Sequence, residues 1–107
     1  MEEHQTEARS PQQCQKFMEI IQKLYNVHLD KNLDYSPHNI TATGEVGLTT
    51  RLWDKMARLM NLQGFDISTG KFSGQKEAKN ESIDDTLVDL ANYAIIALIY
   101  RSGKWGK

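Results

Sequence analysis

Charged side chains repeat at helical spacing in two stretches of this sequence, and each set can take part in phosphate chemistry. The first stretch contains three cations and one carboxylate within eight residues, namely Arg51, Asp54, Lys55 and Arg58. Offsets of three, four and seven residues place all four side chains on one face of a helix. Guanidinium groups hold phosphate oxygens in pairs, and an ammonium group adds a point charge. Arg51, Lys55 and Arg58 are therefore candidate phosphate ligands, with a solvated charged face as the alternative interpretation.

The second stretch contains acidic residues followed by an amide, at spacings of four, four and three: Glu81, Asp85, Asp89 and Asn92. Oxygen ligands along one helix face suit Mg²⁺, which binds one or two carboxylates together with water and substrate phosphate. Glu81, Asp85 and Asp89 are thus candidate Mg²⁺ ligands, and Glu45 at the start of another helix is a fourth. Alternatively, these acids form salt bridges with the cationic face of an antiparallel helix and bind no metal.

A third candidate is the polar segment Lys31–Tyr35, which follows a predicted helix. A tyrosine beside hydrogen-bonding residues can stack on a nucleotide base and hold its edge. Lys31, Asp34 and Tyr35 are therefore candidate nucleotide ligands, and Asn92 is expected to contact the base or the sugar. The alternative interpretation of Tyr35 is a ring that closes the core. The sequence assigns no catalytic residue.

Apolar periodicity predicts three long helices that position these residues. The expected helices run from Ser10-Pro11 to about Asp30, over Glu45–Leu62, and from Asn80 or Ser82 to Arg101. Ser10 is expected to cap the first helix in a capping box, with proline at the first helical position. The segments 31–47 and 61–80 are predicted loops, the former with one short helical turn at Ser36-Pro37. No stretch alternates with period two, so we expect no sheet.

Composition limits the class of protein. The chain has 107 residues, of which 39% are hydrophobic and 25% charged, and its net charge is −1. This predicts one small domain, residues 10–107, after a flexible tail at 1–9. The charge balance argues against bulk nucleic-acid binding, and no apolar run approaches the length of a membrane span. The acidic N-terminus and single cysteine point to a cytoplasmic protein.

The last predicted helix contains a segment, Tyr93–Tyr100, that is apolar on nearly every side. A helix of this kind must be buried all round, and two neighbouring helices cannot cover it. We therefore expect an all-α fold of three long helices and two long loops, completed into a larger helical bundle by homo-oligomerisation. The simplest such assembly is a dimer.

Three stretches together carry a family resemblance: KNLDYSPHNI at 31–40, EVGLTTRLWDKMARLMNL at 45–62 and ESIDDTLVDLANYAIIAL at 81–98. They resemble the phage and bacterial family called nucleotide modification associated domain, type one, from about Gln13 to Arg101. More distantly, Glu81-x-x-Asp84 followed by Asp85 and Asp89 is similar to the second acidic motif of the MazG-type all-α nucleoside triphosphate pyrophosphatases. The second resemblance implies a helical oligomer that binds Mg²⁺ and cleaves nucleotides to the monophosphate and pyrophosphate.

The expected function is therefore nucleotide binding, with Mg²⁺-dependent pyrophosphohydrolysis in nucleotide metabolism as the implied activity. The implied setting is the cytoplasm of a bacterial or phage-infected cell. One alternative is a phage protein that sequesters a nucleotide signal without hydrolysing it, and another is a structural or regulatory subunit. The MazG-type enzymes carry a run of spaced glutamates in their first acidic motif. The matching helix of this chain, at 45–62, offers only Glu45 and Asp54. This difference favours nucleotide binding over hydrolysis.

Overall fold

The computed structural model describes residues 9–74 and 82–107, and this part of the chain is mostly helical. Its elements are α1 (Pro11–Asp34), α2 (His38–Thr41), α3 (Gly44–Gln63), the strands β1 (Phe65–Asp66) and β2 (Lys71–Phe72), and α4 (Ile83–Arg101). The expectation of a mostly helical fold is confirmed. None of the described helices is both long and apolar enough to cross a membrane.

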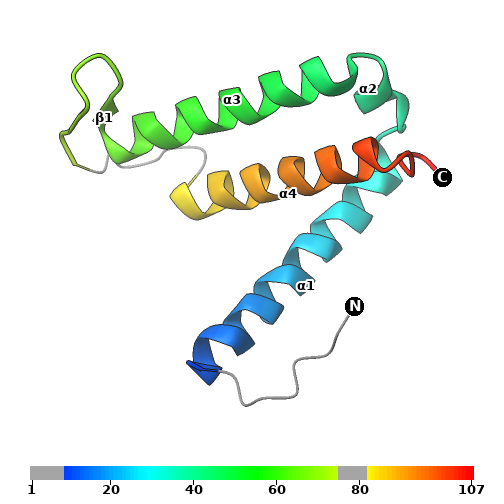
Figure 1. The fold of residues 1–107 in the computed structure, drawn as a ribbon, viewed down its shortest axis with the longest axis horizontal. Coiled ribbons are helices and arrows are strands. Elements are labelled where there is room, and N and C mark those ends of the chain that lie inside the picture. The colour runs from blue at the N-terminus through cyan, green and yellow to red at the C-terminus, as the bar shows by residue number, and fades with distance from the viewer. Residues whose placement is uncertain (1–8, 75–81) are drawn as a thin grey trace.

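The centre of the fold is the pair α3 and α4, which lie side by side and antiparallel (Figure 1). The apolar stripe of α3 is buried at Leu48, Leu59 and Leu62. Two ion pairs define the register of the two helices: Glu45 with Arg101 at 2.7 Å, and Lys55 with Asp89 at 2.9 Å. From Glu45 to Lys55 the chain advances ten residues along α3, while the paired residues run back twelve residues along α4, from Arg101 to Asp89. The antiparallel arrangement brings the cationic helix against the acidic one.

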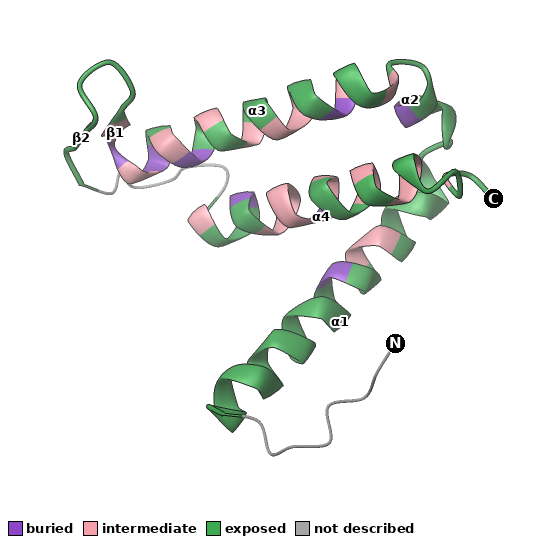
Figure 2. Ribbon diagram, in the orientation of Figure 1, coloured by how far each residue is buried: buried purple, intermediate pink, exposed green. Residues whose placement is uncertain are grey.

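Helix α1 contacts α4 with its last turns, and its other end points away from the α3–α4 pair (Figure 1). Leu24 is its only buried residue, and its first half is exposed throughout (Figure 2). The helix continues to Asp34, one turn beyond the predicted end. The expected cap at Ser10 is wrong: Ser10 has φ 55° and makes no side-chain cap bond, whereas a capping residue takes an extended backbone. Most of the predicted tail, residues 1–8, lies outside the described residues.

The connection between α1 and α3 is shorter and more ordered than the predicted loop at 31–47. It contains the short helix α2, which confirms the expected helical turn after Ser36-Pro37. Ile40 of α2 is buried. The indole Nε1 of Trp105 donates to the carbonyl oxygen of Pro37 at 2.9 Å. The C-terminal residues therefore hold this connection in place.

The connection after α3 forms a small β-hairpin, so the expectation of no sheet is wrong for this segment. The rings of Phe65 and Phe72 lie 4.8 Å apart across the two strands. Hydrogen bonds from the Ser68 hydroxyl and amide hold the turn and lower the pKa of the Asp66 carboxyl. Two-residue strands are too short to show a period-two pattern, which explains the failure. Residues 75–81 of the predicted loop lie outside the described residues.

Gly64 ends α3 in the left-handed conformation, with φ 71°. This conformation suits glycine, since it carries no β-carbon. A β-carbon here would collide with the backbone of Gly74, which returns past the helix end. The residue between α3 and the hairpin must therefore be a glycine.

The apolar segment Tyr93–Tyr100 of α4 is not buried all round within one chain. Leu98 is 68% exposed and Ile95 is 38% exposed. Among the described helices, α3 and the last turns of α1 pack against this helix, and one of its faces is left exposed. The uncovered face agrees with the expectation that two neighbouring helices cannot cover this segment, and its cover by a second copy stays a prediction.

Ser82 caps α4 in a capping box, which confirms one of the two predicted starts of this helix. Its Oγ accepts from the Asp85 amide at 3.0 Å, and the Asp85 carboxylate accepts from the Ser82 amide at 3.4 Å. Ser82→Ala should lower the free energy of unfolding by about 1 kcal/mol, because a helix-start amide loses its acceptor. Ser82→Asp keeps an acceptor and should remain near wild type. Urea unfolding measures both, and equal midpoints for the alanine variant and wild type would contradict the expectation.

Candidate functional site

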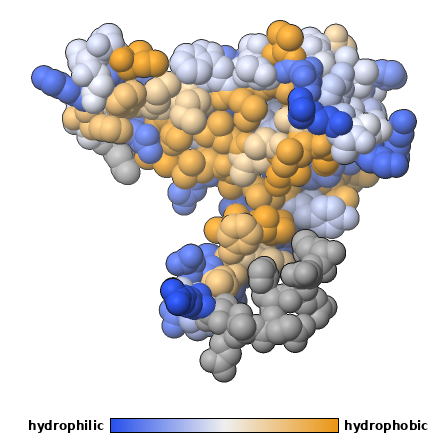
Figure 3. Space-filling model, in the orientation of Figure 1, coloured by the Kyte–Doolittle hydropathy of each residue, from blue (hydrophilic) through white to orange (hydrophobic). Residues whose placement is uncertain are grey.

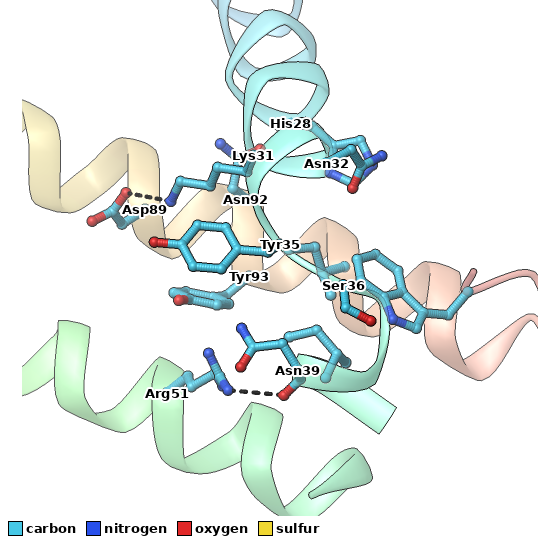
Figure 4. A pocket seen from close by; sticks show the side chains of 13 residues that line it. His28, Lys31, Asn32, Tyr35, Ser36, Asn39, Arg51, Asp89, Asn92 and Tyr93 are labelled. Atoms are coloured by element: carbon cyan, nitrogen blue, oxygen red, sulfur yellow. Dashed lines mark hydrogen bonds and ion pairs between the residues drawn. The ribbon is translucent and has the colours of Figure 1, made fainter. Parts of the chain in front are cut away.

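A cavity of about 230 Å³ lies where the end of α1 and the connection through α2 meet α3 and α4 (Figure 4). Five of the residues proposed from the sequence line it: Lys31, Tyr35, Arg51, Asp89 and Asn92. They come from four different segments, and the antiparallel α3–α4 register is what brings the helical ones to one place. We refer to this space as the central cavity.

Two lysines approach the single carboxylate of the central cavity. The Lys55 Nζ lies 2.9 Å from Asp89 Oδ2, and the Lys31 Nζ lies 3.8 Å from Asp89 Oδ1. The Asp89 and Lys55 side chains are each about a quarter exposed. The pair with Lys55 is of the kind that the salt-bridge interpretation expected for Asp89, whereas Lys31 belongs to α1 and was not part of that expectation. The carboxylate is therefore compensated by protein cations in this structure.

Arg51 is held at the opposite wall. Its Nη2 donates to the carbonyl oxygen of Asn39 at 3.1 Å, and its guanidinium carbon lies 5.8 Å from the centre of the Tyr93 ring. The side chain is half-buried. An arginine carries five N–H donors, and the Asn39 carbonyl is the one acceptor it meets among the described residues. The fixed guanidinium can therefore offer further donors to an anion in the central cavity.

Asn92 contributes a donor with no partner. The residue is 8% exposed, and its Nδ2 makes no hydrogen bond to any described residue. Leaving a buried amide donor unsatisfied costs about 1–3 kcal/mol. Such groups in folded proteins usually face a water or a ligand. Asn92 lines the central cavity, so a rotation of its buried amide would turn this donor toward a polar group bound there.

Aromatic rings complete the central cavity. Tyr35 and Tyr93 lie between the Lys31–Asp89 pair and Arg51 (Figure 4). On the other side, the rings of His28 and Trp105 lie 6.0 Å apart. The sequence patterns did not indicate Asn39, Tyr93 or Trp105 as site residues. Tyr93 could have been indicated by its offset of four residues from Asp89, which places both on one face of α4. Asn39 and Trp105 could not, because contacts with segments far away in the sequence bring them to the cavity.

The other proposed nucleotide ligands lie outside the central cavity. Asp34 is exposed at the end of α1, and Arg58 is exposed on α3. Lys55 does not line the cavity and reaches it only through its ion pair with Asp89. Of the three cations on this face of α3, Arg51 lines the cavity, whereas Lys55 and Arg58 do not.

The proposed metal ligands are not brought together within the described residues. Glu45 pairs with Arg101, twelve residues along α4 from Asp89, which is about 18 Å at the helical rise. Asp85 takes part in the cap of α4, and Glu81 lies outside the described residues. Among the residues described, no three His, Cys, Asp or Glu side chains form a group that can hold a metal ion. The described donors do not by themselves fit Mg²⁺, which stays a prediction.

Comparison with known proteins adds no assignment. No family model, curated protein or solved structure matches the chain. The chemical interpretation of the central cavity therefore rests on its residues.

Removing the Asp89 charge tests the ion pairs. Asp89→Asn should lower the free energy of unfolding by roughly 1–3 kcal/mol, because two lysines lose their common anion at a half-buried position. Asp54→Asn, an exposed carboxylate of α3, is the matched control and should change stability by less than about 0.5 kcal/mol. Thermal unfolding without Mg²⁺ gives both stability changes, and the same measurement with Mg²⁺ shows whether the ion stabilises wild type and each variant. Unchanged stability together with a lost Mg²⁺ effect would instead identify Asp89 as a metal ligand.

Proposed function

We propose that this chain is a nucleotide-binding helical domain and that its ligand occupies the central cavity. The observation that carries the proposal is the buried Asn92 amide, whose Nδ2 has no partner among the described residues. A structural role would have given this donor an acceptor, because the unsatisfied group destabilises the protein. A ligand oxygen or ring nitrogen in the cavity provides that acceptor.

The remaining lining residues suit the parts of a nucleotide. The aromatic faces of Tyr35 and Tyr93 suit a base, and tyrosine can add a hydrogen bond from its hydroxyl. Arg51 and Lys31 supply positive charge for phosphate oxygens. The volume of 230 Å³ is just below the usual range of ligand pockets, about 300–1,000 Å³. It favours a base and sugar inside the cavity, with the phosphates at its mouth.

The geometry favours binding without hydrolysis. Asp89 is already compensated by Lys55 and Lys31, so the cavity presents cations rather than a set of free carboxylates. These cations neutralise phosphate charge directly. Mg²⁺-dependent pyrophosphohydrolysis, which the family resemblance implies, needs further oxygen donors near Asp89. Glu81 is the sequence candidate, and it lies outside the described residues.

Asn92→Leu is the sharpest test, since it should change stability and binding in opposite directions. Leucine has a similar size and lacks the unsatisfied donor. The variant should therefore be as stable as wild type or more stable. Its nucleotide affinity should fall roughly 10-fold or more, because a ligand acceptor loses its partner. Calorimetric titration with ribo- and deoxyribonucleoside mono- and triphosphates, combined with thermal unfolding, measures both. If the variant is less stable and keeps its affinity, Asn92 has a structural role.

Arg51→Ala tests the phosphate contact. It should weaken binding of a triphosphate roughly 10- to 150-fold, the value of a charge-assisted hydrogen bond, and affect the nucleoside much less. Lys71→Ala removes an exposed cation on β2 and serves as the control. Titrations with and without Mg²⁺, each followed by product analysis, separate binding from turnover. Failure of wild type to bind any nucleotide would favour the structural-subunit alternative.

A further inference from the structure

The first half of α1 and the turn after it carry a broad apolar face that none of the described residues covers. Phe17 and Met18 are 66% and 64% exposed, and Tyr25 is 55% exposed. Ile20 and Ile21 beside them are also exposed. Offsets of three, four and seven residues place most of these side chains along one side of the helix. Singly exposed apolar residues are ordinary, but a continuous group of this size marks an interaction surface.

The charged residues of this half lie on the opposite side. Lys16, Glu19 and Lys23 are spaced by three and four residues and form their own stripe. Lys16 and Glu19 pair with each other at 2.8 Å. The apolar face consequently carries no charge. Two copies of it can approach each other without repulsion between like charges.

The apolar surface continues onto α4. Leu87 and Leu98 are exposed there, with Leu98 at 68%. Figure 3 shows hydrophobic colour running from the region of α4 down onto α1. The uncovered face of α4 and that of α1 therefore belong to one extended surface, which we call the α1–α4 surface.

The dimensions of the chain show how much surface is uncovered. The chain exposes 8811 Å², whereas a compact protein of this mass exposes about 6,100 Å². Its radius of gyration is 16.7 Å, against about 13 Å for a compact domain of this length. A specific interface buries about 800 Å² on each partner. The excess of about 2,700 Å² over the whole chain leaves room for an interface of that size.

The partner that covers the α1–α4 surface must be bound permanently. The exposed half of α1 has little tertiary support, and an isolated helix of about 15 residues is marginal in water. A transient partner would leave this half of the helix unsupported for most of the time. A second copy of the chain is always available at equal concentration.

We infer that the α1–α4 surface is the interface of a homodimer, in which the same surface of a second copy covers it. The pairing is isologous, with a two-fold axis through the interface. This inference is independent of the proposed function, since it requires no ligand.

Light scattering across micromolar concentrations should give a mass of two 12.2 kDa chains for wild type. Ile21→Glu places a carboxylate in the apolar face and should raise the dimer dissociation constant roughly 100-fold or more. Lys23→Glu makes a charge substitution on the opposite side of the same helix and should remain dimeric. A monomeric wild type, or a dimer that Ile21→Glu leaves unchanged, would overturn the inference.

Cys14 provides a second measurement, since it is the only cysteine and lies on α1 three residues before Phe17. It is exposed in the single chain, so dimerisation should slow its alkylation. Ile21→Glu should restore fast alkylation, and Lys23→Glu should not. If Ile21→Glu unfolds, dilution of wild type replaces it: alkylation should accelerate as the dimer dissociates. Alkylation that is equally fast at all concentrations would contradict the proposed interface. Nucleotide binding by a monomeric wild type would leave the proposed function intact while refuting the dimer.

Discussion

The antiparallel packing of α3 against α4 is the constraint on which the rest of this structure depends. Buried leucines of α3 hold the two helices together, and the ion pairs Lys55–Asp89 and Glu45–Arg101 accompany one register. A shift by one helical turn would separate both pairs. The same register places Arg51 opposite Asp89 and Tyr93, so the packing of the core also decides which polar residues share a cavity.

Helix α1 has two distinct roles along its length. Its last turns pack against α4 and bring Lys31 to Asp89, and the chain then turns at Tyr35 to complete the wall of the central cavity. Its first half leaves the rest of the chain and presents an apolar face. A second copy covering that face would also hold the helix that forms the cavity wall. Ligand binding and assembly would then be coupled through the position of one helix.

The polar residues of the central cavity combine positioned cations with one unsatisfied donor, and the proposed nucleotide binding rests on this combination. Each cation has a partner that fixes its position: Lys31 meets Asp89, and Arg51 meets Asn39. Asn92 has none among the described residues. A site that keeps a buried donor unsatisfied loses stability in the absence of ligand and recovers it on binding. The arrangement therefore favours recognition, and catalysis would need additional carboxylates beside Asp89.

The sequence by itself determined the long helices, because apolar periodicity and the signals at Ser82 and Pro11 act locally. It also indicated Lys31, Tyr35, Arg51, Asp89 and Asn92, since helical spacing reports which side chains share a face. It could not separate Glu45 from Asp89, because that difference depends on which residues lie opposite across the α3–α4 interface. Trp105 and Asn39 joined the cavity through contacts with distant segments, and the short β-hairpin formed without a periodic signal. Tertiary structure alone decided these points, since they depend on packing between segments that no local pattern encodes.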